Sequence, residues 1–124
     1  HVFRPFETVE IAGFRLLPLP VAHGNVFVYG FRAGDLGYIT DAKALPEPTL
    51  EALKGVRVLV LNALWFGKRH PTHLTVEEAI DVAHRIGAER TYLPHLTHRL
   101  VHAELEARLP HGISPAYDGL VVEI

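Results

Sequence analysis

The chain has 124 residues, enough for one domain and too few for two. Hydrophobic residues make up 48% of it and charged residues 21%, so it should fold around a core. The net charge is −2 with scattered Lys and Arg, which argues against a nucleic-acid partner, and no apolar run approaches the ~18 residues of a membrane span. Without cysteine, disulfides and thiolate metal sites are excluded, and we expect a cytoplasmic protein.

The first half of the chain is dominated by strand patterns. Strands are expected over 7–11 and 14–21, joined by a turn at Ala12-Gly13. Pro18 and Pro20 place the second of them at a sheet edge or a bulge. The later expected elements are strands over 26–31 and 36–40, a helix over 49–54, a strand over 56–61, a helix over 75–86, a strand over 90–93, a helix over 102–109, and two short strands around a turn at 118–119.

The helix over 75–86 has the clearest local signals. Thr75 and Glu78 match a capping box, in which each side chain accepts a hydrogen bond from the other residue's backbone N–H. Apolar residues at helical spacing follow, from Val76 to Ile86, and Gly87 suits the C-terminal end. Helices that alternate with strands indicate an α/β layered sheet.

Polar residues with metal-ligand chemistry stand just beyond three predicted strands. They are His23, Asp41 and His95, and His73 lies in the loop before the capped helix. Taken singly, such an Asp is usually a turn or cap residue and such a His is usually solvated. Side chains at strand ends can nevertheless converge, because the sheet holds their loops together. A set of His and carboxylate suits Zn, Mn or Fe.

Seven segments together carry a resemblance to a known family. They are Val-Ala-His-Gly at 21–24, Tyr-Gly-Phe at 29–31, Tyr-Ile-Thr-Asp-Ala-Lys-Ala-Leu-Pro-Glu at 38–47, Val-Leu-Val-Leu-Asn-Ala-Leu at 58–64, His-Pro-Thr-His-Leu-Thr at 70–75, Tyr-Leu-Pro-His-Leu-Thr-His at 92–98 and Ala-Tyr-Asp-Gly-Leu at 116–120. The chain thus resembles the second half of metallo-β-lactamase-fold hydrolases, most of all their PhnP-like phosphodiesterase branch. The resemblance spans nearly the whole chain in order.

The resemblance implies a fold and an incomplete site. The fold is the C-terminal half of a four-layer αββα sandwich, with one mixed sheet, helices on one outer face and an apolar face on the other side. The family's His-x-His-x-Asp-His motif does not occur in residues 1–124, so we expect it in an N-terminal half absent from this chain. We therefore expect that missing half as a partner, an inactive chain without it, and a homo-oligomer.

The resemblance also assigns roles to individual residues. His23 would bind one metal, His95 the other, and Asp41 would bridge both. His73 would face the phosphate without binding metal and act as the catalytic acid. Contacts to the metal ligands or to the substrate would come from His70, His98, His102 and Asp118.

The implied activity is metal-dependent hydrolysis of a small phosphodiester. Two divalent ions, Zn or Mn, would share a hydroxide that attacks phosphorus. A tRNA 3′-end endonuclease is the second enzyme reading, but those enzymes usually carry a long arm between the ligands matching His23 and Asp41, and here seventeen residues with one predicted hairpin separate them. The non-enzyme reading is a non-catalytic half-domain or interaction fragment.

Overall fold

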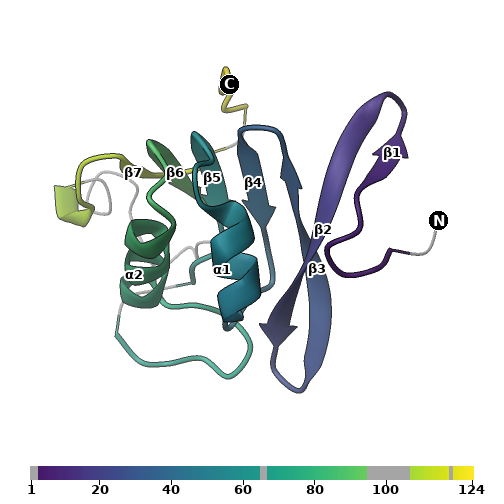
Figure 1. Cartoon of the computed structure of the whole chain (residues 1–124). Helices are drawn as coiled ribbons and strands as arrows, with labels where there is room; N and C mark the ends of the chain where they lie inside the picture. The colour runs from purple at the N-terminus through teal and green to yellow at the C-terminus, as the bar shows by residue number, and fades with distance from the viewer. Residues whose placement is uncertain (1–2, 65–66, 95–106, 118) are drawn as a thin grey trace.

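The computed structural model describes residues 3–64, 67–94, 107–117 and 119–124 (Figure 1). Within them, seven strands form one sheet in the order in which they occur along the chain. The strands are β1 (Val9–Ile11), β2 (Phe14–His23), β3 (Val26–Ala33), β4 (Leu36–Ile39), β5 (Val58–Leu61), β6 (Arg90–Leu93) and β7 (Ile113–Pro115). Strands β1 to β4 pair antiparallel and β4 to β7 pair parallel, so the predicted mixed sheet is confirmed.

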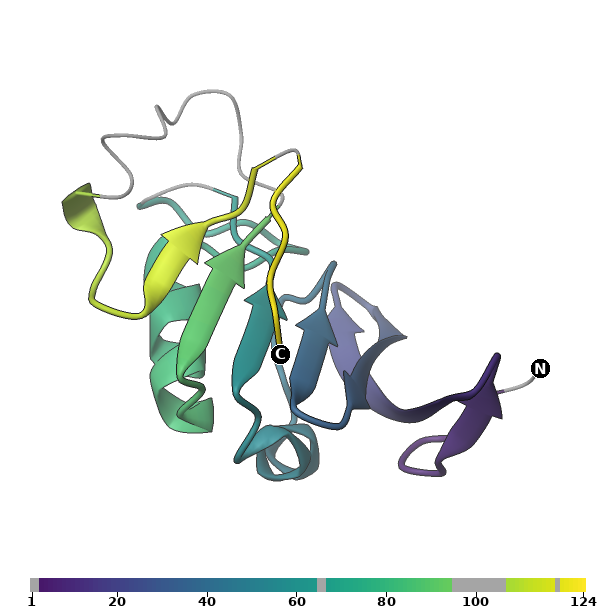
Figure 2. The same cartoon turned by 90° about the horizontal axis from the view of Figure 1, so that it is seen from above.

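Two helices connect the parallel strands and cover one face of the sheet (Figures 1 and 2). Helix α1 (Glu47–Leu53) joins β4 to β5, and α2 (Val76–Ile86) joins β5 to β6. Helix α1 begins two residues before the predicted start at 49. Its first turn accepts a proline, because backbone N–H groups in the first turn of a helix have no partner within the helix. The helix predicted over 102–109 lies mostly outside the described residues. No described helix is long and apolar enough to cross a membrane.

Helix α2 confirms its predicted boundaries. The Thr75 side chain accepts a hydrogen bond from Glu78 N at 3.2 Å, and Glu78 Oε1 accepts one from Thr75 N at 3.0 Å. Gly87 ends the helix in the left-handed conformation, with φ of 76°. The start of α2 is therefore fixed by contacts within one turn, immediately after His73.

The core lies between the helices and the sheet. Its sheet side alternates along each strand, as expected where one face is buried. The principal core residues are Leu19, Val21, Ile39, Leu59, Leu61 and Leu93 from the sheet, and Leu50, Leu53, Val76, Ala79, Ala83 and Ile86 from the helices. Gly37 lets α1 approach β4 closely, because a Cβ there would lie 2.8 Å from Leu53 Cδ2.

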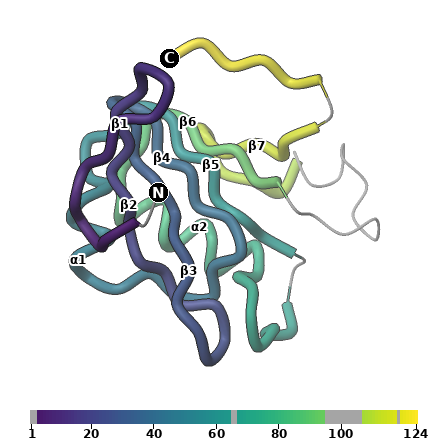
Figure 3. The backbone as a smooth tube through the Cα atoms, turned by 90° about the vertical axis from the view of Figure 1, so that its right-hand side faces the viewer, coloured from purple at the N-terminus to yellow at the C-terminus, as the bar shows by residue number. Residues whose placement is uncertain are grey.

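The opposite face of the sheet is apolar and only partly covered. The C-terminal segment 119–124 runs along this face, on the other side of the sheet from α1 (Figures 2 and 3). A hollow of about 320 Å³ is lined by Leu36, Tyr38, Val58, Val60, Tyr92, Ala116, Tyr117, Leu120, Val122 and Ile124. Tyr38 remains 49% exposed and Ile124 55%. The prediction of helices on one face and an apolar second face is confirmed.

The last predicted strand is wrong. Residues 120–124 form no strand, although β7 precedes them as expected. The segment crosses the sheet face instead of joining its edge, and Glu123 O accepts a hydrogen bond from the Arg90 side chain at 2.6 Å. Its apolar residues are thus used to cover the sheet rather than to extend it.

Strand β2 has an open edge where Pro18 and Pro20 stand, as predicted. Strand β1 pairs only with residues 14–16, and beyond them no described strand pairs with the outer edge of β2, which has a single isolated bridge from Ala22 to Ala44. Pro18 O accepts from Phe6 N at 2.9 Å, and Pro20 O accepts from Thr49 Oγ1 at 2.6 Å. Both carbonyls point away from β3. Because a residue's N–H would point to the same side, the lack of an N–H in these prolines removes no hydrogen bond between β2 and β3.

Candidate metal centre

His23 and Asp41 lie at the same end of the sheet, where β2 and β4 both end. His23 is the last residue of β2, and Asp41 follows β4 after one residue. Lys43 N donates to Ala22 O at 2.7 Å, and Ala22 N donates to Ala44 O at 2.9 Å. These backbone bonds hold the segment after Asp41 against the residue before His23.

Asp41 has a left-handed backbone conformation, with φ of 56°. Among residues other than glycine, Asp and Asn adopt this region most readily. The fully buried Asn62 holds the next residue by both polar groups, because Oδ1 accepts from Ala42 N and Nδ2 donates to Ala42 O, each at 2.9 Å. The turn that presents Asp41 is therefore fixed from the end of β5.

The loop before α2 brings His73 to the same place. Leu74 N donates to Ala42 O at 3.0 Å, which ties this loop to the Asp41 turn. His73 Nε2 lies 3.4 Å from Asp41 Oδ1, and the rings of His73 and His23 are 5.1 Å apart at their centroids. The ring of His70 lies 5.3 Å from that of His73. The structure thus brings His23, Asp41, His73 and His70 into one cluster.

The remaining predicted site residues cannot be placed. His95, His98, His102 and Asp118 lie outside the described residues. Among those described, no group of three His, Cys, Asp or Glu side chains is arranged to hold a metal ion by itself. The metal roles predicted from the resemblance therefore stay predictions.

The donor atoms of the cluster suit a divalent metal nonetheless. His23 Nδ1 lies 3.0 Å from Thr72 O, and because a carbonyl can only accept, Nδ1 carries the proton. In the neutral ring, Nε2 of His23 is then the nitrogen with the lone pair that can bind a metal, and metal-binding histidines usually donate their other N–H in this way. The Asp41 side chain is 51% exposed and its carboxylate can accept further ligands. Nitrogen and carboxylate donors without sulfur fit Zn or Mn.

An ion pair links the Asp41 segment to the start of α2. Lys43 Nζ lies 2.9 Å from Glu78 Oε1. Burial raises the pKa of the Glu78 carboxyl, but hydrogen bonds from Lys43 and Thr75 and the charge of Lys43 together lower the pKa below its ordinary value of 4.5. Glu78 thus caps the helix and binds Lys43 at the same time. It therefore joins the two segments that carry Asp41 and His73.

Sequence reasoning did not single out Asn62 and Thr72. Both stand inside segments that carry the family resemblance, but their roles depend on partners 20 and 49 residues away. A signal for Asn62 was present in the sequence, because a polar residue directly after the apolar run 58–61 needs buried partners. Thr72 had no comparable signal, since a threonine in a loop is unremarkable.

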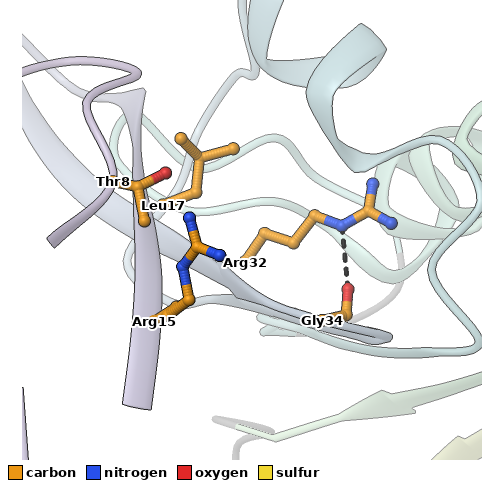
Figure 4. Close-up of a pocket in the computed structure, with 5 residues that line it drawn as sticks. All are labelled: Thr8, Arg15, Leu17, Arg32 and Gly34. Carbon is orange, nitrogen blue, oxygen red and sulfur yellow. Dashed lines mark hydrogen bonds between the residues drawn. The ribbon is translucent and has the colours of Figure 1, made fainter. Parts of the chain in front are cut away.

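A separate pocket of about 390 Å³ lies near the other end of β2 and β3 and contains two arginines (Figure 4). It is lined by Thr8, Arg15, Leu17, Arg32 and Gly34. The Arg32 guanidinium donates to the carbonyls of Gly34, Ala52 and Lys54 at 2.8–2.9 Å. Arg32 thereby closes the C-terminal end of α1, and the pocket lies about 20 Å along β2 from His23.

A family model of the beta-lactamase superfamily domain matches residues 1–96. The chain belongs to this family. Among solved structures, a diphosphatase from the PhnP family is 39% identical, with a TM-score of 0.92 over 96% of this chain and 47% of that one. The metallo-β-lactamase fold protein YhfI from Bacillus subtilis is 21% identical with a TM-score of 0.80, covering 95% of this chain and 53% of its own, and shows the fold alone. The predicted family and its PhnP-like branch are thus confirmed.

Two further relatives widen the comparison. Human tRNase Z, short form, has a TM-score of 0.70 at 16% identity over 94% of this chain and 44% of its own. An octanoyltransferase from Porphyromonas gingivalis is 36% identical over 118 residues, which are 94% of this chain and 24% of the relative. The beta-lactamase superfamily chain described here thus spans about a quarter of that curated relative and about half of each of the three structures.

Proposed function

We propose that this chain supplies half of the active site of a metal-dependent phosphodiesterase. The observation that carries the proposal is the cluster of His23, Asp41 and His73, in which His23 Nδ1 is bonded to a carbonyl and Nε2 is left for a metal. The 39% identity to a diphosphatase of the PhnP family supports hydrolysis of a phosphate bond. The His-x-His-x-Asp-His ligands are proposed to come from an N-terminal half.

Each residue has a distinct task in the proposed reaction. Two divalent ions, when bound, supply a nucleophile from water near neutral pH and offset charge on the phosphoryl oxygens. His23 and Asp41 would hold these ions, together with His95. His73 donates a proton from Nε2 to the leaving oxygen, and its other nitrogen, Nδ1, is held 3.0 Å from Thr72 Oγ1.

The proposed substrate is a small phosphodiester rather than a tRNA. Between His23 and Asp41 the chain forms the hairpin of β3 and β4, which leaves no room for a long substrate-binding arm. The net charge of −2 also gives little attraction for a polyanion. The exposed apolar face around Tyr38 and Val60 is proposed to receive the sheet of the N-terminal half.

The octanoyltransferase relative raises a competing substrate class. Its name describes a protein of which this chain spans 24%. This match therefore supports octanoyl transfer less strongly than the diphosphatase match supports phosphodiester hydrolysis. A single leaving group can compare the two classes directly. Bis(p-nitrophenyl) phosphate and p-nitrophenyl octanoate both release p-nitrophenol, so their hydrolysis rates are read at the same wavelength.

The test uses the full-length protein loaded with Zn or Mn. We expect hydrolysis of bis(p-nitrophenyl) phosphate that chelators abolish and that Asp41→Ala abolishes. The control is Asp81→Ala, which removes an exposed carboxylate on α2 and should leave the rate unchanged. The proposal fails if the octanoate ester is hydrolysed and no phosphodiester is hydrolysed with either metal.

A further inference from the structure

The pocket that contains Arg15 and Arg32 lies on the helix-covered side of the sheet. Arg15 and Leu17 point to one side of β2, because side chains alternate along a strand. Leu17 pairs with Arg32, so Arg32 points to that side too. Leu19 continues the same row and is buried in the core beneath the helices. We therefore expect an N-terminal half that docks on the opposite, apolar face to leave this pocket open.

Arg32 is a fixed positive charge in this pocket. Its Nε donates to Gly34 O at 2.9 Å, and its Nη1 donates to Ala52 O at 2.8 Å and to Lys54 O at 2.9 Å. Because carbonyl groups have no net charge, these bonds orient the guanidinium group without neutralising it. The N–H groups of Nη2 have no acceptor among the residues that the structure describes.

Arg15 is the second cation of the pocket. Its guanidinium group makes no hydrogen bond or ion pair with the part of the chain that the structure describes. This holds although Glu10 stands opposite Arg15 in β1. Arg15 is the diagonal neighbour of Arg32 across β2 and β3, a relation that places Cβ atoms about 7–8 Å apart. Two cations at this separation repel each other, and a bound anion would offset the repulsion.

We propose that this pocket binds a small phosphomonoester through Arg15. A guanidinium group can donate two parallel N–H groups to one phosphate, and the donors of Arg15 are not used elsewhere in the described chain. Thr8 adds a hydroxyl group beside Leu17 (Figure 4). Arg32 supplies the second positive charge. The inference does not rest on the proposed function, because the pocket lies about 20 Å along β2 from His23 and needs no metal ion.

The size and lining of the pocket favour an organic phosphate. A water molecule takes up about 30 Å³ of liquid volume, so one phosphate group fills only part of the 390 Å³. Gly34 adds no side chain to fill the rest, and Leu17 gives the carbon atoms of a ligand an apolar surface. A phosphomonoester has three terminal oxygens to accept from Arg15 and Thr8, whereas a carboxylate has two.

Nuclear magnetic resonance can follow this pocket and the metal centre separately in one protein. The Zn-loaded, ¹⁵N-labelled full-length protein is titrated with phenyl phosphate. Arg15 Nε–H and the backbone N–H of Gly34 report on the pocket, while the backbone N–H of Gly24 reports on the metal centre beside His23. We expect saturable shifts of both pocket signals. Inorganic phosphate should bind more weakly than phenyl phosphate, and acetate more weakly than either. The proposal fails if the pocket signals do not shift or if acetate binds as tightly as phenyl phosphate.

Variants then assign the binding to named groups. Arg15→Gln should weaken the binding followed at Gly34 by about tenfold or more, as for a lost hydrogen bond to a charged group. Thr8→Val keeps the shape of the side chain and should weaken it by about threefold. Arg85→Gln is the matched control, because it removes an exposed arginine on α2 and should leave the affinity unchanged. Arg32 is left intact because it holds the last carbonyls of α1.

Two further variants keep the test decisive. Arg15→Lys retains the charge and loses the paired donors, so its affinity should lie between those of the wild type and Arg15→Gln. Glu10→Gln removes the carboxylate opposite Arg15 and should strengthen binding slightly. Equal losses in Arg15→Gln and Arg85→Gln would assign the binding to general charge attraction and overturn the proposal. Binding that appears only in Glu10→Gln would also overturn it, because Arg15 would then be paired with Glu10.

Discussion

Asn62 binds both backbone groups of Ala42, with its side-chain oxygen and nitrogen each 2.9 Å from their partners. Asn62 follows β5 and Ala42 follows β4, so this contact joins two adjacent parallel strands at their carboxyl ends. Asn62 N also donates to Ile39 O at 3.1 Å. Asp41 lies between two residues held by Asn62, which explains how its left-handed conformation persists.

Replacing Asn62 with Ala should destabilise the fold and displace Asp41. Two buried backbone groups of Ala42 lose a partner, so we expect the free energy of unfolding to fall by about 2–4 kcal/mol. Denaturation in urea measures this change. Asn25→Ala, which alters an exposed turn, should have little effect. An Asn62→Ala protein as stable as the wild type would mean that water replaces the lost contacts.

Asp41 and His73 should differ in their effect on metal content. Asp41→Ala removes a proposed ligand of both ions, so bound metal and activity of the full-length protein should fall together. His73→Ala should keep the metal and reduce turnover on the order of 10²–10⁴-fold, as for a lost general acid. Metal analysis of the purified variants checks both. If His73→Ala empties a metal site and His95→Ala does not, the two histidines have exchanged roles.

The effect of His73→Ala should also depend on the leaving group. A nitrophenolate leaves without protonation, so loss of the acid should cost little for bis(p-nitrophenyl) phosphate and much more for an alkyl phosphodiester. Rates for a series of leaving groups of rising pKa measure this dependence. An equal loss across the series would assign His73 to binding or charge stabilisation instead.

The ion pair of Glu78 and Lys43 should make stability depend on pH. Because folding lowers the pKa of Glu78, its contribution is present above the pKa of the unfolded chain and is lost as the pH falls through the folded value. We expect Glu78→Gln to lower the Tm at pH 7, and its difference from the wild type to shrink as the pH is lowered below 4.5. Glu51→Gln, which removes an exposed pair with Lys54, is the control and should change Tm less. A difference that persists unchanged at pH 3 would exclude the charge as its cause.

The apolar sheet face should make this chain self-associate when it is produced alone. Tyr38 is half exposed beside Val60 in the hollow of this face, and an exposed patch of this kind favours association. Light scattering should show oligomers that Tyr38→Lys disperses. Phe14→Lys, at a residue 68% exposed on β2, controls for the added charge. A soluble monomer at high concentration would count against the predicted partner half and homo-oligomer.

The features predicted best from the sequence are those that depend on residues close together along the chain. The Thr75–Glu78 cap and the bounds of β6 were predicted to the residue, because their patterns lie within one turn or one short strand. Strand β1 was predicted too long, since residues 7 and 8 have no partner strand although their pattern alternates. The last expected strand failed because the tail covers a sheet face, which periodicity along the tail cannot reveal.

The candidate site was predictable as a set of strand-end side chains and not as a bonded network. Positions after strands indicated His23 and Asp41, the loop before the capped helix contained His73, and the family resemblance assigned a role to each of the three. The contact of His23 with Thr72 spans 49 residues, and that of Asn62 with Ala42 depends on the pairing of β4 with β5. Such contacts require the register of the sheet, which no local pattern encodes.

Pro18 and Pro20 also limit how copies of this chain can meet. An unpaired strand edge is a template on which another chain can add a strand and begin a fibril. On the outer edge of β2 these residues offer no N–H, and their carbonyls are already bonded to Phe6 and Thr49. A second copy therefore finds no ladder of donors there. We therefore expect association at the open face of the sheet, where it would give a closed complex rather than a growing β-structure.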